Sequence, residues 1–454
     1  MDSRGSAAST SIAEIRRQCV ALLDQGAIPA AALEPSAPST ISARILVAED
    51  DAENNRFLVE VLSAEGHSVA VARDGESALA QAASDEFDLV LLDLGLPRLS
   101  GFEVLERLQR DGWHTPVVVV TGRRGVADAV RCIEQGADDF LTKPIHIELL
   151  RARVNSSIEK MRLREREFGQ FFPPKLARQF AHRPKLINEL PSKHAEVSVL
   201  FCDLRNFTLI SERVGPETTT RWLRAVMNEL TECVVGSEGV LVDYAGDELM
   251  AMWGAPEEIN DHAARACATA VEILRRLPAM SARWQASIGG ATDLAIGINS
   301  GRALVGHVGT QRKTKYGALG DAVNIGSRVL GATRYVGARV LISGATCAAL
   351  GPHWSAGSIR RLAQVQLKNV AQPLSLSELR PAHNGDEATA LFRDFERALA
   401  HFENQQFEQA AALVKQLLTD HSSDGPLLSL SARIDAAMTE SATDFDPVWQ
   451  LPSK

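Results

Sequence analysis

Two aspartates beside apolar, strand-like sequence are the residues of this chain best suited to chemistry. Asp203 follows the apolar run 197–202, and Asp247 stands in a Gly-Asp pair between the apolar segments 240–245 and 248–253. This pattern predicts a hairpin with Asp247 at its tip, so both carboxylates are expected at the ends of paired strands. Two carboxylates so placed can hold two divalent cations, which clamp the attacking and leaving oxygens in phosphoryl or nucleotidyl transfer.

A second group of polar residues lies further along the chain. Asn324 and Arg328 are four residues apart in a segment that predicts a helix from about Asp321, so they project from one helix face. An amide and a guanidinium side by side can hold a ribose oxygen and a phosphate, with charge-assisted bonds from the arginine. Lys368 adds a point charge suited to terminal phosphates. Taken singly, each of these residues also fits an ordinary surface role.

The first third of the chain carries an independent cluster. Glu49 and Asp50 follow one apolar strand-like run, and Asp93 follows another. Thr121 and Lys143 end two further runs. In a doubly wound sheet such carboxyl ends meet at the switch point, where ligands bind. Three carboxylates there suit Mg²⁺, and a carboxylate beside Mg²⁺ and a lysine is primed to accept a phosphoryl group.

The elements that must position these residues fall into separate domains. Over 44–158, short continuous apolar runs alternate with helical patterns, which predicts a parallel sheet covered by helices on both faces. A charged segment, 159–193, is expected to extend the last helix into a linker, with Pro173-Pro174 breaking it. Over 194–380, strands and helices alternate less regularly, and hairpins indicate an α+β domain with antiparallel pairs.

The ends of the chain are expected to be less structured. Residues 1–43 are rich in Ala, Ser and Pro and should be mostly disordered, apart from one short helix. Residues 387–437 predict a helical hairpin that resembles a single tetratricopeptide repeat. Because one repeat cannot bury its apolar face alone, the hairpin should dock on the preceding domain or on its dimer mate. Residues 438–454 are expected to form a disordered tail.

The segment 44–160 resembles a two-component response-regulator receiver, a flavodoxin-like fold. The motif residues that carry the resemblance are Glu49, Asp50, Asp93, Pro97, Thr121, Phe140 and Lys143-Pro144. The resemblance implies that Asp93 is the phospho-acceptor and that a histidine kinase is the phosphodonor. It also implies one Mg²⁺ at Glu49, Asp50 and Asp93, and a switch through Thr121, Phe140 and Lys143. A degenerate receiver kept only for dimerisation is the alternative.

The segment 194–380 resembles the class III adenylate/guanylate cyclase domain, which has a ferredoxin-like fold. The resemblance implies that Asp203 and Asp247 bind two Mg²⁺ or Mn²⁺ ions. Asn324 would orient the ribose, Arg328 would stabilise the transition-state phosphate, and Lys368 would hold the β- and γ-phosphates. Such domains are typically head-to-tail homodimers, with metals from one chain and Asn/Arg from the other.

Two purine-facing positions depart from the family pattern. The position four residues before the hairpin aspartate, usually Lys in adenylate cyclases and Glu in guanylate cyclases, is Asp243. The position after Tyr316, usually Thr or Asp for adenine and Cys in many guanine-specific enzymes, is Gly317. A carboxylate accepts from adenine N6 or from guanine N1–H and N2–H₂, but it gives adenine N1 no donor. The hydrogen-bond pattern favours guanine and family frequency favours ATP, so both substrates stay open.

Composition excludes some classes of function. The formal net charge of −9 argues against a nucleic-acid partner, which needs a clustered positive surface. No apolar run reaches the roughly 20 residues that span a bilayer, so a cytoplasmic protein without membrane contact is expected. The leading hypothesis is a phosphorylation-regulated cyclase that makes cyclic AMP, with cyclic GMP as a variant. A non-catalytic nucleotide-binding or dimerisation module is the alternative.

Overall fold

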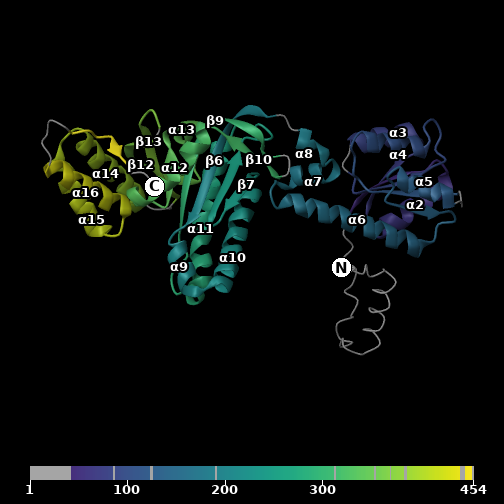
Figure 1. Ribbon diagram of the computed structural model, residues 1–454, viewed down its shortest axis with the longest axis horizontal. Helices are drawn as coiled ribbons and strands as arrows, with labels where there is room; N and C mark the ends of the chain where they lie inside the picture. Colours follow the sequence, from purple (N-terminus) through teal and green to yellow (C-terminus); the bar gives the residue numbers. More distant parts are fainter. Residues whose placement is uncertain are drawn as a thin grey trace, which may run out of the picture.

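The computed structural model describes residues 42–84, 87–122, 126–189, 192–310, 313–351, 354–368, 370–382, 386–439 and 445–451. Three bodies follow one another along an elongated molecule: an α/β domain, a larger α+β domain and a group of C-terminal helices (Figure 1). Most of the expected N-terminal segment, residues 1–41, lies outside the described residues.

The first domain is a five-stranded parallel sheet with the order β2-β1-β3-β4-β5. Its strands are β1 (Arg44–Ala48), β2 (Ser68–Ala72), β3 (Leu89–Asp93), β4 (Val117–Thr121) and β5 (Asp139–Thr142). Its helices are α2 (Ala52–Ala64), α3 (Gly75–Ser84), α4 (Gly101–Arg110), α5 (Val126–Glu134) and the long α6 (Ile147–Gly169). Strands β3 and β4 are buried along their whole length, as continuous apolar runs predict. The flavodoxin-like prediction is confirmed.

Two short helices, α7 (Pro174–His182) and α8 (Lys185–Glu189), lie between the first two domains (Figure 1). The charged segment 159–167 is part of α6, as its pattern predicts. Helix α6 ends at Gly169, shortly before Pro173-Pro174. Pro174 lies in the first turn of α7, where a backbone N–H would have no partner within the helix, so the missing N–H of proline costs nothing there. We call α7, α8 and residues 170–173 the neck.

The second domain is built on a mixed nine-stranded sheet. Strand β6 (Lys193–Leu204) lies in its middle, antiparallel to both β8 (Glu248–Trp253) and β9 (Leu294–Thr310). The other strands are β7 (Val240–Ala245), β10 (Lys313–Leu319), β11 (Val340–Ser343), β12 (Gly357–Gln366), β13 (Leu374–Pro381) and, from the C-terminal region, β14 (Trp449–Gln450). Its helices are α9 (Phe207–Val214), α10 (Pro216–Gly236), α11 (His262–Ile288), α12 (Asp321–Val336) and α13 (Gly344–Ala349). The predicted α+β domain with antiparallel strand pairs is confirmed.

Helix α12 lies directly on the sheet because glycines let the two backbones approach. A Cβ on Gly297 of β9 would lie 2.1 Å from the backbone nitrogen of Leu330. A Cβ on Gly326 of α12 would lie 2.7 Å from the Val199 side chain on β6. The close approach fixes the height and rotation of α12, and it leaves the Asn324 side of the helix exposed.

The C-terminal region differs from the predicted hairpin. It has three helices, α14 (Asp386–Glu403), α15 (Phe407–Asp420) and α16 (Gly425–Thr439), instead of two. Strand β14 (Trp449–Gln450) pairs with β12, in a segment expected to be a disordered tail. The physical reason is burial: residues of all three helices share an apolar cluster with α12, β11, β12 and β13. The predicted docking of this region on the preceding domain is what the structure shows.

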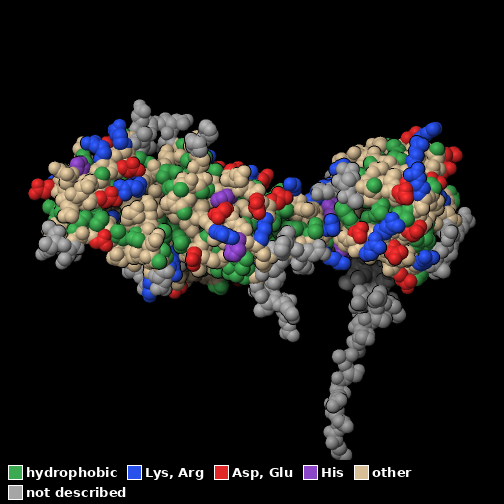
Figure 2. Space-filling view, turned by 90° about the horizontal axis from the view of Figure 1, so that it is seen from above, with side chains coloured by type: hydrophobic (Ala, Val, Ile, Leu, Met, Phe, Trp, Pro, Cys, Tyr) green, Lys and Arg blue, Asp and Glu red, His purple; other side chains and the backbone are tan. Residues whose placement is uncertain are grey.

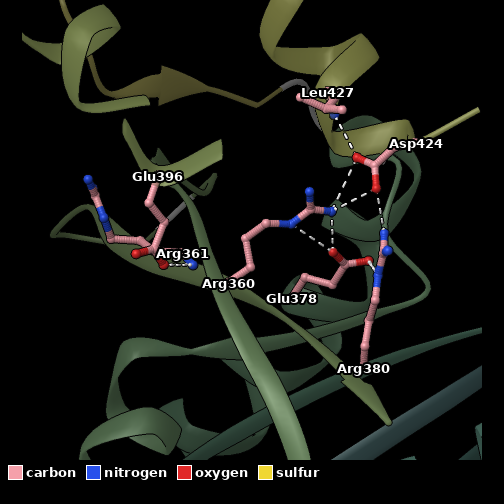
Figure 3. Close-up of polar contacts among 7 residues, drawn as sticks. All are labelled: Arg360, Arg361, Glu378, Arg380, Glu396, Asp424 and Leu427. Atoms are coloured by element: carbon pink, nitrogen blue, oxygen red, sulfur yellow. Dashed lines mark hydrogen bonds and ion pairs between the residues drawn. The ribbon is translucent and has the colours of Figure 1, made fainter. Parts of the chain in front are cut away.

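A buried ionic network joins the tail helices to the sheet (Figure 3). Arg360 of β12 is fully buried and pairs with Glu378 of β13 and with Asp424, just before α16. Asp424 also accepts from Arg380 at 2.7 Å and from the Leu427 backbone at 3.0 Å. Burial opposes the charge of Asp424, but the two arginines hold its pKa below the ordinary value.

Replacing Asp424 with alanine should weaken the attachment of α16 to strands β12 and β13, because it removes the carboxylate that pairs with Arg360 and Arg380. Arg360 would keep only Glu378 as an ionic partner while still fully buried. We expect the free energy of unfolding to fall by about 3 kcal/mol, which is the lower end of the cost of removing one partner of a buried ion pair. Urea unfolding, with hydrogen exchange of the α14 to α16 amides, measures it. Asp394→Ala removes a carboxylate from exposed pairs and should change little; equal effects of the two substitutions would contradict the role of the network.

Candidate functional sites

The receiver pocket lies at the carboxyl ends of β1 and β3. Ligand oxygens of Glu49, Asp50 and Asp93 all lie within 4.8 Å of one another. Lys143 reaches into this cluster from the end of β5 and donates to Asp93 at 2.7 Å and to Glu49 at 2.9 Å. Thr121, at the end of β4, is buried beside them. The structure therefore brings together the residues that the sequence predicts for this pocket.

The pocket holds more negative than positive charge. Burial raises the pKa of Glu49, and the neighbouring Asp93 carboxylate raises it further, although Lys143 opposes both effects. Burial also works against the charge of Lys143, but its hydrogen bonds to Asp93 and Glu49 hold its pKa above the ordinary value. Three carboxylates facing one ammonium leave an acidic pocket that fits a hard divalent cation.

The phospho-acceptor expected from the sequence is nearly buried and is held by hydrogen bonds to both carboxylate oxygens. Asp93 is 8% exposed, its Oδ1 accepts from the Gly95 backbone at 3.0 Å, and its Oδ2 accepts from Lys143. Gly101 lets α4 start close behind it, since a Cβ there would lie 2.2 Å from the Asp93 carbonyl oxygen. The lysine is placed to neutralise charge that develops on an incoming phosphoryl group. Phe140, expected to signal the state of this site, is half-buried on β5.

The metal-binding edge predicted for the second domain is formed by β6 and the β7–β8 turn. Asp203 pairs in register with Glu248, the residue directly after Asp247. Gly246, at φ +70°, makes the turn that carries Asp247. Asp203 and Asp247 are both half-buried. The two carboxylates thus lie on adjacent strand ends, as their sequence pattern predicts.

The electrostatic field at this edge is negative. Burial raises the pKa of the Cys202 thiol strongly, and the carboxylates of Asp203 and Glu248 raise it further. Cys202 itself lies in the apolar core beneath the edge. An acidic, partly exposed edge above a dry core is a fitting place for divalent cations.

The phosphate-binding residues predicted from the sequence lie on and beside α12. Asn324 is exposed, and Arg328 is half-buried one turn later. Arg328 donates through Nη1 to the carbonyl oxygen of Lys368, in the turn after β12. Arg328 is thereby held beside the turn that carries Lys368, so residues from distant parts of the sequence meet at one place.

The two positions expected to face the purine lie close to one another, and a third residue, Lys315, lies beside them. Asp243 of β7 forms an ion pair with Lys315 of β10. Gly317 lies against Val242: a Cβ added to the glycine would lie 2.9 Å from Val242 Cγ1. Lys315 lies in a basic stretch that looks like a solvated loop in the sequence; only strand β10 brings it to Asp243. Its position two residues before Gly317 is the signal that could have found it.

The neck is fixed to the receiver at the edge opposite Asp93. Asp88 precedes β3 and accepts from Arg178 of α7 at 3.0 Å, and the Thr115 hydroxyl lies 2.8 Å from His182 Nδ1. The His114 backbone donates to the His182 carbonyl oxygen at 2.7 Å. Burial lowers the pKa of His182 to about 4, and the charge of Arg178 adds to this. The imidazole is therefore neutral in this contact.

The neck also belongs to the core of the second domain. Phe172 packs against Phe180 of α7 and lies 6.4 Å from Tyr316 of β10, ring centre to ring centre. The Leu241 backbone of β7 donates to the Phe171 carbonyl oxygen at 2.9 Å. Figure 2 shows how narrow the connection between the two larger bodies is. Through it, the receiver is linked to the strands that carry Asp243 and Lys315.

Comparisons with known proteins agree with this division. Residues 45–155 match the model of the response regulator receiver domain, and residues 190–371 match that of the adenylate and guanylate cyclase catalytic domain. Adenylate cyclase 1 of Rhizobium meliloti is 37% identical over 153 residues, 34% of this chain and 23% of its own length. Response regulator protein PmrA of Pseudomonas aeruginosa is 45% identical over 113 residues, 25% of this chain and 51% of its own length.

The chain thus spans about a quarter and about half of the lengths of these two relatives. Among solved structures, the adenylyl cyclase CyaB of P. aeruginosa aligns at 23% identity and a TM-score of 0.39, covering 43% of this chain and 98% of that one. Taken together, the family matches define a response regulator receiver domain joined to a class III adenylate/guanylate cyclase domain. Among the described residues, no helix combines the length and apolar character needed to cross a bilayer.

The receiver geometry makes a direct prediction for Asp93. Asp93→Asn removes the nucleophilic carboxylate oxygen but keeps the shape of the side chain, so the purified protein should no longer gain a phosphoryl group from acetyl phosphate and Mg²⁺. Intact mass spectrometry measures the added mass. Asp111→Asn, at an exposed carboxylate of the same domain, is the matched control and should be phosphorylated normally. Unchanged phosphorylation of Asp93→Asn would place the acceptor elsewhere.

Proposed function

We propose that the protein is a phosphorylation-regulated class III nucleotide cyclase that converts ATP to cyclic AMP and pyrophosphate in a two-component pathway. The observation that carries the proposal is the register of β6 with β8, which sets Asp203 beside the turn of Asp247. The ion-binding edge, the Asn324 and Arg328 pair on α12, and the neighbouring Lys368 provide the three kinds of contact that cyclisation of a nucleoside triphosphate needs.

Asp203 and Asp247 would hold two divalent cations, Mg²⁺ or Mn²⁺. Bound there, the ions would acidify the ribose 3′-hydroxyl and neutralise charge on the α-phosphate and on the leaving pyrophosphate. The half-buried position of both carboxylates supports this assignment, because each side chain remains open to solvent on one side. The buried strand residues beneath them keep the edge rigid, which preserves the distance between the two carboxylates.

The side chains on α12 and beside it would hold the substrate. Asn324 would fix the ribose so that its 3′-oxygen lies in line with the α-phosphorus. Arg328 would neutralise the charge that grows on the α-phosphate oxygens in the transition state. Lys368 would bind the β- and γ-phosphates, which leave as pyrophosphate. The bond between Arg328 and the Lys368 carbonyl oxygen supports this division, since it orients the guanidinium next to the lysine.

We further propose that the working unit is a homodimer whose sites combine two chains. In this arrangement Asp203 and Asp247 of one protomer face Asn324, Arg328 and Lys368 of the other. The exposure of Asn324 on the free side of α12 supports a partner there. A single chain would then be inactive, and any input that changes the dimer geometry would change the rate.

Phosphorylation of Asp93 by a cognate histidine kinase would be such an input. Helix α6 begins four residues after Lys143, runs along the receiver and leads into the neck. The neck contacts β7 through Phe171 and β10 through Phe172, so a shift of α6 would reach the strands that carry the nucleotide-site residues. This continuous set of contacts favours a coupling element over a passive tether.

Two alternatives keep specific support. Asp243 favours guanine in one respect, because a carboxylate accepts well from guanine N1–H and N2–H₂. A guanylate cyclase therefore remains the variant of the same chemistry. A non-catalytic module that passes the receiver state to a partner is favoured only by the unusual pair at positions 243 and 317.

Mixing two inactive variants tests both the metal edge and the dimer. Asp203→Ala and Arg328→Ala should each lose at least about a thousandfold in rate. Equal mixtures of the two should recover roughly a quarter of the wild-type rate, since roughly half of the dimers combine unlike chains and each of these has one intact site. The rate of cyclic nucleotide formation measures this. Full activity of either single variant would contradict its assignment, and no recovery on mixing would contradict sites shared between chains.

Product analysis decides the substrate. The full chain is incubated separately with ATP and with GTP in the presence of Mn²⁺, and the products are separated by chromatography. We expect cyclic AMP and pyrophosphate from ATP, at a higher kcat/KM than that for cyclic GMP from GTP. Asp247→Ala is the control for contaminating cyclases and should give no product. Absence of any cyclic product from either nucleotide would favour the non-catalytic module.

A further inference from the structure

We propose that Lys315 determines base specificity in the nucleotide site, where it acts with Asp243 as a hydrogen-bonding pair on the edge of the purine. Lys315 would donate to adenine N1, and Asp243 would accept from the N6 amino group. The inference rests on the proposed function, because it takes Asp243 as a residue that faces the base of a nucleoside triphosphate.

The first observation is the ion pair itself. Lys315 Nζ and Asp243 Oδ2 bind each other from strands β10 and β7. Their side chains are 44% and 46% exposed, so a ligand can reach both. The second carboxylate oxygen, Oδ1, accepts from the Tyr244 backbone at 2.9 Å, which holds the carboxylate in place. A donor and an acceptor are thus held next to each other at an open surface.

The second observation concerns Gly317, the position from which a base-reading side chain is expected. A Cβ there would lie 2.9 Å from Val242 Cγ1, and Val242 is buried in the core. A side chain at 317 would have to displace this core residue. Lys315, two residues earlier, projects from the same side of β10 and forms the ion pair with Asp243. A side chain at 317 would therefore need Val242 to shift, whereas Lys315 already lies at Asp243.

Tyr316 holds Lys315 in position. It lies between Lys315 and Gly317, and its side chain points to the opposite side of the strand. There it is 7% exposed and packs in the cluster that contains Phe172 of the neck. The strand is therefore anchored on one side, and Lys315 is presented on the other.

A donor next to an acceptor, in the order that the protein fixes, matches the edge of adenine and not that of guanine. An ammonium only donates and an ionised carboxylate only accepts. Adenine offers an acceptor at N1 beside a donor at N6, so Lys315 on N1 and Asp243 on N6 satisfy both. Guanine offers an acceptor at O6 beside a donor at N1, the reverse order along the edge. A pair fixed by the protein therefore discriminates between the two bases.

A plain surface ion pair is the competing explanation, and its consequences differ. Exposed ion pairs contribute little to stability, so Lys315→Ala should fold normally under either explanation. Lys193→Ala is the matched control. Lys193 is a 40% exposed lysine of the same domain, and it pairs with Glu258 at 2.8 Å. Only the base-reading role predicts that the two lysine variants differ in nucleotide preference.

The test measures binding of 3′-deoxy-ATP and 3′-deoxy-GTP to the full chain with Mg²⁺, by equilibrium dialysis. Both nucleotides lack the attacking hydroxyl and so cannot cyclise. Wild type and Lys193→Ala should prefer the adenine nucleotide by about tenfold or more, and Lys315→Ala should bring the ratio of the two Kd values close to one.

A nucleotide without N1 isolates the proposed contact. Wild type should bind the 1-deaza form of 3′-deoxy-ATP more weakly than 3′-deoxy-ATP, whereas Lys315→Ala should bind the two equally, as a double-mutant cycle requires for a direct contact. A ratio of Kd values that Lys315→Ala leaves unchanged would overturn the proposal. An equal loss of affinity for both bases would overturn it too, since it would place the lysine on the phosphates.

These outcomes are distinct from failure of the proposed function. If wild type forms no cyclic product but its binding preference is lost in Lys315→Ala, the cyclase assignment fails and the role of Lys315 stands. If wild type forms cyclic AMP and Lys315→Ala keeps the same preference, the cyclase assignment stands and Lys315 is an ordinary surface lysine. If wild type prefers the guanine nucleotide, the adenine-reading role of Lys315 is overturned.

Discussion

The pairing of β6 with its two antiparallel neighbours is the constraint on which the second domain depends. Strand β6 is bonded to β9 from Lys193 to Leu204 and to β8 from Ser198 to Asp203. Both faces of β6 are buried, so a slip of one residue would exchange the side chains that fill the two cores and move Asp203 to the other face. The burial of nearly the whole strand therefore also fixes the edge proposed to bind metal, because the same register that fills the core sets Asp203 beside the β7–β8 turn.

The two bodies that flank this sheet act on different parts of the candidate site. The neck lies against β7 and β10, which carry Asp243 and Lys315. The tail helices share an apolar cluster with α12. Strand β14 pairs with the end of β12, just before Lys368. The receiver side therefore supports the residues assigned to the base, and the tail supports those assigned to the phosphates. A displacement on either side would disturb one half of the substrate contacts before the other.

Much of this arrangement could be predicted from local sequence. Strand ends followed by carboxylates locate Asp93 and Asp203, since continuous apolar runs reveal buried strands whatever their partners. The third tail helix was missed because its apolar residues complete a core shared with α12. The spacing of residues within 425–439 does not indicate that α12 is the element they pack against. The network of Arg360 and Asp424 was missed for the same reason: its members are 64 residues apart, and each looks like a surface charge in the sequence.

Lys315 shows most clearly where sequence patterns stop being informative. Position 317 could be recognised as unusual from the chain alone, but a glycine gives no indication of what replaces the absent side chain. The answer depends on Val242, whose burial closes the space at 317, and on the pitch of a strand, which brings the side chain two positions earlier to Asp243. An ionised carboxylate cannot donate to adenine N1. In the proposed role, Lys315 would supply that donor, and the unusual Asp243 would then be compatible with ATP.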